Sequence, residues 1–300
     1  AEGESEGWME STFIRWLLVL SIGGLILFVH RALTAEHPIV NLRVFKYREF
    51  AAGSIISFVT GIGLFGTLFL LPVFLQNLRQ YSALQSGVIM LPWAIASAVC
   101  MGIAGSLVAR CSPRPLIAAG LICCVVGMGL MGTVTYLSGP EHLFWPQVLI
   151  GAGIGLQMVP LMTASLGGLS GLELGDGSGL FNMVRQLGGS MGIAFLATLI
   201  SKRIDFHHAV LAEHVSVYHP DTLARLLMMR QFFAGKGAAL IDATQQALTA
   251  LDLTTKSQAV LLAYEDVFLF IALTFAVALP LILLLHKTRP GETSVNLPMH

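Results

Sequence analysis

Arg185 is the residue whose surroundings in this sequence point most directly to chemistry. It is the only charged residue between positions 178 and 200, in a segment that is otherwise mostly apolar. An arginine at the centre of a bilayer costs about 2.5–3.5 kcal/mol on insertion scales, so its side chain is expected to face a cavity, a partner or the membrane interface. Together with Asn182 and Gln186, Arg185 is therefore predicted to line or gate a transport path.

A structural role is the alternative for each polar side chain of this kind. Arg185 could extend to the membrane surface, or pair with Glu173 or Asp176, and so fix the end of its helix. Gln76 and Gln157 are uncharged polar residues in otherwise apolar segments. Each is predicted either to line the same path and hydrogen-bond a transported compound, or to bond to another helix, as polar side chains in membrane bundles commonly do.

Two short enzyme patterns occur, and neither has the context that its chemistry needs. The stretch from Gly188 to Gly192 fits GxSxG, but a nucleophile on that pattern needs a strand-to-helix turn. Because Gly188 and Gly192 are four residues apart in an apolar segment, they are predicted to pack two helices closely. Residues 127–132 fit GxGxxG without a preceding strand. We therefore predict no catalytic residue, no bound cofactor and no enzyme activity.

Histidines gather in the segment 201–259, where imidazole could bind zinc or copper. They are His207, His208, His214 and His219. No cysteine accompanies them, and their spacing places them on different faces of a helix, so no metal site is predicted. The four cysteines of the chain lie elsewhere, without the CxxC spacing of a metal site.

Composition places the chain in a lipid bilayer. Of its 300 residues, 55% are hydrophobic and 11% are charged, and the mean hydropathy is +0.77. Soluble domains carry about 25% charged residues, so a soluble enzyme, a coiled coil and a disordered tail are excluded. The 17 basic and 17 acidic residues balance, so no nucleic-acid partner is predicted. The acidic start after Ala1 lacks the charge of a signal peptide, and an internal cut is expected.

Seven segments are apolar over about the 20 residues that a helix needs to cross a bilayer. They are 13–30, 51–77, 82–108, 116–137, 143–166, 178–200 and 260–285. Four prolines inside them, Pro72, Pro92, Pro160 and Pro280, are predicted to kink helices whose neighbours satisfy the freed carbonyls. The sequence therefore predicts an all-α integral membrane protein.

Basic residues in the short connections give the orientation, because cytoplasmic loops carry more lysine and arginine than outer loops. Those that fall on one side are Arg31, Arg43, Lys46, Arg48, Arg110, Arg114, Lys287 and Arg289. Only Arg15 and Arg79 lie near span ends on the other side. The N-terminus is therefore predicted outside and the C-terminus in the cytoplasm, with the long loop 201–259 outside.

The last six segments divide into two groups of three, 51–137 and 143–285. Two inverted repeats of three helices form each half of many secondary transporters. The segment 13–30 is then a surplus helix, joined to the six others by the basic linker 31–49.

Three motifs in chain order resemble a known family. The first, 71–91, reads LPVFLQNLRQYSALQSGVIML, and its match rests on Pro72, Gln76, Ser82-Ala83-Leu84, Gly87 and Leu91-Pro92. The second, 179–192, reads GLFNMVRQLGGSMG, and the third contains Gln258, Ala259, Tyr264, Asp266, Phe268 and Pro280. The resemblance extends over residues 8–290. The chain resembles the C-terminal half of the fourteen-helix major facilitator drug:proton antiporters of the EmrB/QacA type (DHA2 family).

This resemblance implies a division of the chain and a function. Residues 1–49 would be a linker transmembrane helix and its cytoplasmic connection, 50–290 the six-helix half with the outer loop 201–259, and 291–300 a cytoplasmic tail. An N-terminal half and a first linker helix would be missing. The implied function is proton-coupled export of lipophilic small molecules across the cytoplasmic (inner) membrane of a bacterium, with the lipid bilayer and the missing half as partners.

The outer loop carries further expectations. Segments 221–233 and 238–252 have helix-like apolar spacing and are predicted to form short amphipathic helices over the outer mouth. In two-membrane bacteria, the resemblance implies that a periplasmic adaptor protein binds there. Beyond the loop, Glu265 and Asp266 either titrate as protons enter or lie solvated at the interface.

The turn after the third predicted span resembles the facilitator loop signature GxLxDRxGxR at Gly105, Arg110 and Arg114. Ala109 stands where the signature has an acid, and Ser112 where it has a glycine. The arginines are predicted either to anchor the cytoplasmic face on helix carbonyls and lipid head groups or to act as a conformational latch.

Two other functions stay open at the level of sequence. One is a facilitator that exports a metabolite or a siderophore. The other is a membrane enzyme or scaffold that transports nothing, which would need polar residues converging at one depth. Because no acid lies deep within 51–137 or 143–172, the main proton carrier is expected in the missing half.

Overall fold

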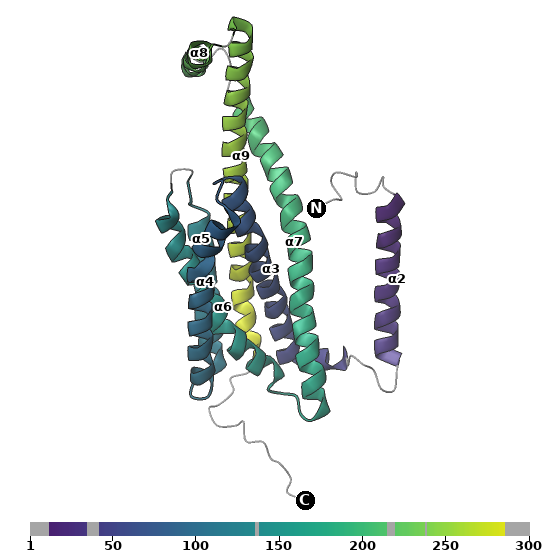
Figure 1. The fold of residues 1–300 in the computed structure, drawn as a ribbon. Coiled ribbons are helices and arrows are strands. Elements are labelled where there is room, and N and C mark those ends of the chain that lie inside the picture. The colour runs from purple at the N-terminus through teal and green to yellow at the C-terminus, as the bar shows by residue number, and fades with distance from the viewer. Residues whose placement is uncertain (1–11, 35–41, 136–137, 215–219, 238, 286–300) are drawn as a thin grey trace, which may run out of the picture.

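The computed structural model describes residues 12–34, 42–135, 138–214, 220–237 and 239–285, and the elements within them are helices. The α-helices are α2 (Thr12–Thr34), α3 (Arg48–Asn77), α4 (Ala83–Val108), α5 (Pro113–Met131), α6 (Pro140–Leu166), α7 (Leu172–His214), α8 (Pro220–Gly235) and α9 (Leu240–Ala278). Two 3₁₀-helices are η1 (Leu42–Lys46) and η2 (Leu279–Leu284) (Figure 1).

Six of these helices, α3, α4, α5, α6, α7 and α9, are long and apolar enough to cross a membrane. Each corresponds to one of the last six predicted spans, so the predicted all-α membrane fold is confirmed. Two predicted ends are wrong, because α5 ends at Met131 rather than at 137 and α9 gives way to η2 after Ala278 rather than running to 285. The first predicted span corresponds to α2, where the shorter stretch Arg15–Gly24 is apolar. Figure 1 shows α2 standing apart from the bundle, to which it connects near η1. That α2 also crosses the membrane stays a prediction.

Three of the four prolines lie inside α-helices, and that they kink these helices stays a prediction. Pro72, Pro92 and Pro160 lie inside α3, α4 and α6. Pro280 does not lie inside an α-helix, because α9 ends at Ala278 and the chain continues as the 3₁₀-helix η2. A proline lacks the N–H that an α-helix needs, and the tighter 3₁₀ turn is a common way for a helix to end.

The bundle consists of two groups of three helices. One group packs α3, α7 and α9 together, and the other packs α4, α5 and α6. The groups join where α5 packs against α9 and α3 against α6. Exchanging the first three helices for the last three maps the α3–α7 pair onto the α6–α4 pair. This one pair of contacts fits the predicted three-plus-three repeat, whose two groups are α3, α4 and α5 and then α6, α7 and α9.

Glycines bring α6 close to α4. A Cβ atom built on Gly151 would lie 2.2 Å from the Trp93 carbonyl oxygen, and one on Gly155 would lie 2.4 Å from that of Ser97. Both distances are too short for any side chain, so glycine is required for the helices to approach this closely.

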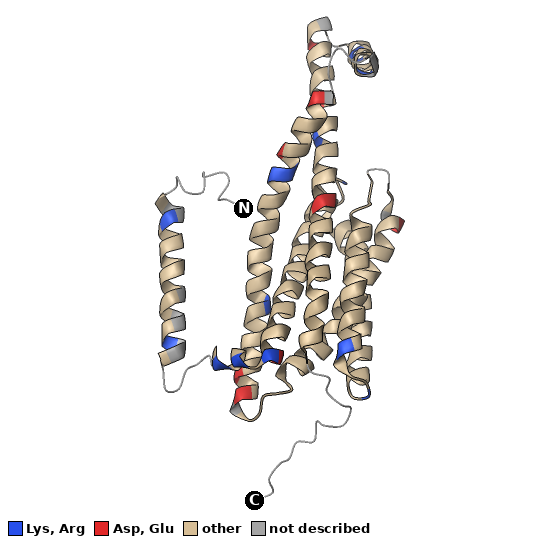
Figure 2. Cartoon of the chain, turned by 180° about the vertical axis from the view of Figure 1, so that it is seen from behind, with Lys and Arg blue, Asp and Glu red and all other residues tan. Residues whose placement is uncertain are grey.

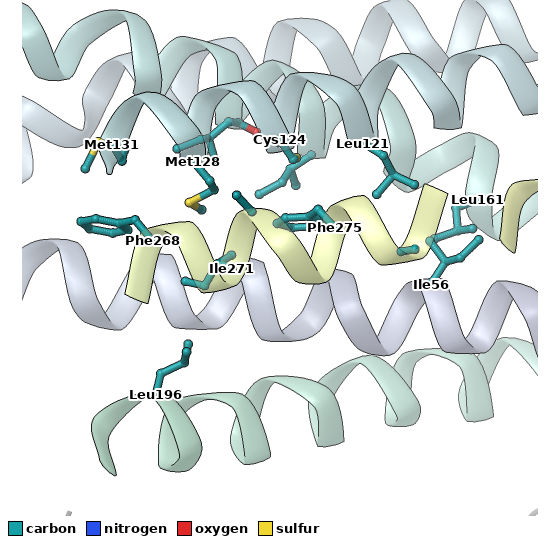
Figure 3. Close-up of a cluster of buried hydrophobic side chains, with 14 of the residues drawn as sticks. Ile56, Leu121, Cys124, Met128, Met131, Leu161, Leu196, Phe268, Ile271 and Phe275 are labelled. Atoms are coloured by element: carbon teal, nitrogen blue, oxygen red, sulfur yellow. Dashed lines mark hydrogen bonds between the residues drawn. The ribbon is translucent and has the colours of Figure 1, made fainter. Parts of the chain in front are cut away.

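The interior of the bundle is filled by apolar side chains around α9. Phe268, Ile271 and Phe275 are at most 1% exposed. Figure 3 shows them between side chains of α3, α5 and α6, with Leu196 of α7 on the far side. The labelled partners are Ile56, Leu121, Cys124, Met128, Met131, Leu161 and Leu196. Close packing of this kind associates helices in a membrane, where lipid and side chains are equally apolar.

Two helices extend well past the bundle and form a stalk. α7 has 43 residues and α9 has 39, so they are about 65 Å and 58 Å long, about twice the hydrocarbon thickness of a bilayer. Figure 1 shows the end of α7 rising beside α9, whose beginning extends further and has α8 beside it. We call residues 201–214 of α7, α8 and residues 240–259 of α9 the outer stalk, after the predicted outer loop 201–259 to which they correspond.

The outer stalk corrects the sequence prediction for 201–259. The expected first amphipathic helix, 221–233, corresponds to α8. The expected second one, 238–252, is not separate, because it is the beginning of the continuous helix α9. Hydropathy falls at residue 200, where a membrane span could end, but helical hydrogen bonding continues in water and α7 runs on to His214.

Candidate functional site

The deep polar site is built on one face of α7. Asn182 and Arg185 are three residues apart, a spacing that puts side chains side by side on a helix. The Arg185 Nη2 donates a hydrogen bond to the Asn182 Oδ1 at 2.7 Å. The Asn182 Nδ2 in turn donates to the backbone carbonyl of Ser178 at 3.1 Å, which fixes the orientation of the amide.

The guanidinium of Arg185 also reaches a second helix. Its Nη1 lies 3.1 Å from the Met158 Sδ on α6, and sulfur is a weak acceptor. Arg185, Asn182 and Met158 are each partly buried. No ion pair joins Arg185 to Glu173 or Asp176 in the part of the chain that the structure describes. Arg185 is therefore a cation held by neutral partners at the seam between α6 and α7.

The backbone around Arg185 is pressed against α3. A Cβ on Gly61 would lie 2.1 Å from the Arg185 carbonyl oxygen. One on Gly188 would lie 2.2 Å from the Phe58 carbonyl oxygen, and one on Gly192 would lie 2.9 Å from the Ile62 Cα. This contact fixes the height and rotation of α7, and therefore the place from which Arg185 extends.

The other predicted path residues do not join Arg185 and Asn182. Gln186 is exposed, and so is Gln76, which lies in the last turn of α3 at the opposite end of the bundle. Gln157 is fully buried between α5 and α6, where its Nε2 donates to the Cys124 Sγ at 3.7 Å and its Oε1 has no partner. The structure thus brings together two of the five residues.

A second polar site lies higher on α7. The His207 Nε2 lies 2.7 Å from the Asp266 Oδ2 of α9, and the Arg203 Nε lies 3.4 Å from the same oxygen. The His208 Nε2 lies 3.2 Å from the Asp252 Oδ1. Asp266 is therefore paired rather than simply solvated.

Within the described residues, no three His, Cys, Asp or Glu side chains are arranged to hold a metal ion. Of the four histidines singled out above, His219 and the side chain of His214 lie outside the described part of the chain.

Sequence reasoning predicted neither the contact of Arg185 with Met158 nor the pairing of Asp266 with Arg203 and His207. Met158 and Arg185 are 27 residues apart on different helices, and no sequence pattern links them. The second polar site could have been suspected from the sequence, because Arg203 and His207 are four residues apart and so share one face of a helix.

Comparison with known proteins shows the family of this chain. The profile described as Major Facilitator Superfamily matches residues 5–193. The chain belongs to the major facilitator superfamily. Its members are transporters, and with six apolar helices of membrane-spanning length the chain is part of a multi-pass membrane protein.

Relatives narrow the type of facilitator. An uncharacterized MFS-type transporter, YhcA of Bacillus subtilis, is 32% identical over 223 residues, which are 74% of this chain and 42% of the relative. The multidrug export protein EmrB of Escherichia coli is 30% identical over 74% of this chain and 44% of its own length. EmrB of Haemophilus influenzae is 27% identical over 91% and 52%. The resemblance to the EmrB type is confirmed, and the chain spans about half the length of these relatives.

The facilitator loop signature ends in a contact with the last helix. The Arg114 Nη2 donates to the carbonyl oxygen of Leu283 at 3.1 Å and also to that of Leu285. Arg110 is exposed, and no heavy atom lies within 4 Å of a Cβ built on Gly105. Arg114 thus caps the free carbonyls at the end of η2, where a positive charge is favourable. The contact is compatible with an anchor or with a latch.

Proposed function

We propose that this chain is the C-terminal half, with one linker helix, of a proton-coupled exporter of lipophilic compounds. The architecture supports this, since a three-plus-three bundle needs a second half to enclose a substrate path. The names of relatives support it too: besides the EmrB proteins, one relative is the lincomycin resistance protein LmrB of Listeria monocytogenes, 31% identical over 66% of this chain.

The observation that carries the proposal is the state of Arg185. A guanidinium within a membrane span is costly to keep, and such residues mark transport paths or partners. Its partners here, Asn182 and Met158, are neutral, so its positive charge is not cancelled by a carboxylate. Polarizable sulfur and a fixed amide hold the cation while leaving it able to interact with a passing compound or with the other half of the exporter.

The distribution of charge supports the proposed location. Figure 2 shows charged residues gathered at the lower end of the bundle and along the stalk, with few between. With the basic connections at the cytoplasmic face, the start of α2 and the outer stalk lie outside the cytoplasmic membrane. Large apolar side chains are exposed on the stalk: Phe206, Leu223, Leu227, Met228, Phe232, Leu248 and Leu253. They support an adaptor protein as the partner of this surface in two-membrane bacteria.

The test is export by the full-length protein in inside-out membrane vesicles, with a fluorescent lipophilic dye and an imposed proton gradient. Arg185→Ala should reduce the export rate at least about tenfold at equal abundance, and Arg185→Lys should retain part of it. Met191→Ala is the matched control, because Met191 lies on the same helix and is 61% exposed.

Normal export by both Arg185 variants would contradict the role of this residue. Export by the wild-type protein that persists after the proton gradient is collapsed would contradict proton coupling.

A further inference from the structure

The second polar site joins α7 to α9 at two heights. His207 and His208 are adjacent on α7, yet their partners Asp266 and Asp252 are 14 residues apart on α9. Fourteen residues of α-helix span about 21 Å. The two imidazoles therefore reach in opposite directions along α9. We call the group formed by His207, Arg203, Asp266 and the adjacent Glu265 the outer clamp.

The outer clamp has a deficit of one positive charge when His207 is neutral. Glu265 and Asp266 carry two negative charges, and Arg203 carries one positive charge. Glu265 is partly buried and interacts electrostatically with both Asp266 and His207. The side chains of His207 and Asp266 are 18% and 32% exposed, against 37% and 65% for His208 and Asp252. Solvent therefore screens the His208–Asp252 pair more than the His207–Asp266 pair.

The neighbouring helices α3 and α5 meet this part of α9 with apolar groups, and Arg79, which follows α3, donates from Nη2 to the Thr135 carbonyl at 2.7 Å near this level. α3 meets this part of α9 with Phe74, whose ring packs edge-on against Tyr264 at 5.2 Å. α5 meets it with Gly132, where a Cβ would lie 2.8 Å from Leu269. Besides the outer clamp itself, the titratable and charged groups near His207 are Asp205 and His208 on α7, Tyr264 on α9 and Arg79 after α3.

The hydrogen bond determines where a proton would bind. A carboxylate only accepts hydrogen bonds, so neutral His207 must donate to Asp266 from Nε2. Its Nδ1 then carries the free lone pair and takes up the proton. The Nε2–H···Oδ2 bond is kept, and a positive imidazolium then faces the carboxylate, so the hydrogen bond becomes part of an ion pair.

We propose that the outer clamp is a binding site for a single proton, which tightens the contact between α7 and α9 when His207 is protonated. Histidine changes charge between about pH 5 and pH 8, so the clamp responds to the acidity of the compartment that it faces. Only the identity of that compartment, outside the cell, rests on the proposed orientation. The change in the α7–α9 contact does not require transport.

The experiment measures the distance between α7 and α9 in the purified full-length protein. Spin labels are placed at Glu213→Cys and Leu253→Cys, both exposed positions outside the clamp, after the native cysteines of the full-length protein, including the four of this chain, are replaced by alanine. Distances are recorded by electron paramagnetic resonance between about pH 8 and pH 5. We expect the wild-type distance distribution to narrow and its mean to shorten as the pH falls.

Three variants locate the response. His207→Gln and Asp266→Asn should each abolish the pH dependence, because the first removes the proton acceptor and the second its counter-charge. His208→Gln should remove less than half of it. His142→Gln is the matched control, since His142 is an exposed histidine on α6, and it should leave the response unchanged.

A wild-type distance that does not change with pH would overturn the proposal, whatever the variants do. A full response in folded His207→Gln, or a lost response in His142→Gln, would also overturn it. Because the measurement is made in detergent without a gradient, none of these results would contradict the proposed export function.

Discussion

Arg185 and Arg203 sit on the same helix and are held in opposite ways. They are 18 residues apart, which is five full turns, so they share one face of α7. Arg185 bonds to the amide of Asn182 and the sulfur of Met158, and both groups are neutral. Arg203, with 45% of its side chain exposed, pairs with the carboxylate of Asp266. The deep arginine keeps its charge available, whereas the outer one is cancelled and serves to join two helices.

Charge reversal should separate the two arginines most strongly. Arg185→Glu puts a carboxylate within the membrane beside an amide and a thioether, neither of which can neutralise it. We expect its abundance and its export to fall to background, because an unpaired buried charge costs several kcal/mol. Arg203→Glu should keep at least half of the wild-type abundance, since water reaches that position. Fluorescence size-exclusion chromatography and dye export measure both effects, and equal losses would contradict the comparison.

A carboxylate placed beside Arg185 should make its surroundings resemble those of Arg203. Asn182→Asp retains the size of the side chain and supplies a counter-charge to Arg185. We expect a normally abundant protein whose dye export is about tenfold slower, because the cation is then neutralised. Asn182→Ala, which removes the amide without adding charge, should slow export less. Faster export by the aspartate variant than by the alanine variant would show that an uncancelled charge is not what matters.

The glycine contact that positions Arg185 should tolerate no side chain. Gly188→Ala pushes a methyl group against the Phe58 carbonyl, and overpacking of this kind costs about 1–3 kcal/mol. We expect a lower Tm in detergent and slower export. Gly179→Ala is the control, because Gly179 is exposed on the same helix and has no atom within 4 Å of a Cβ. An equal fall in Tm for the two variants would argue against the α3–α7 contact.

The smallest effect is expected from removing the outer ion pair. Arg203→Ala should cost about 0–1 kcal/mol, because partly exposed pairs are screened by solvent. The loss of Tm should shrink further in about 1 M salt, where the Debye length is only about 3 Å. Arg185→Lys, measured alongside, should show no such salt dependence because its partners are uncharged. A salt-independent loss for Arg203→Ala would mean that packing, not charge, holds that contact.

The sequence could predict the bundle because long apolar runs have one stable structure in lipid. It could also single out Arg185, since a lone charge in such a run is conspicuous. It could not supply Met158 as a partner, because contacts between helices depend on their rotation and tilt. For the same reason Gln76 and Gln186, polar in the sequence, turn out to lie on exposed surfaces.

The stalk was missed for a different reason. Hydropathy reports where lipid ends, whereas a helix ends only where its backbone hydrogen bonding stops. The close packing at Gly151 and Gly155 of α6, by contrast, could have been predicted, because these glycines repeat the spacing of Gly188 and Gly192.

The unbroken course of α7 gives the molecule a mechanical property. One rigid rod of 43 residues carries Arg185 about a third of the way along its length, and Arg203 and His207 of the outer clamp about three quarters of the way along, towards its tip at His214. A slight rocking of its base against α3 sweeps the tip through a larger arc, in proportion to the distance from the pivot. A partner bound at the tip would therefore be displaced by small movements at the level of Arg185, or would restrain them.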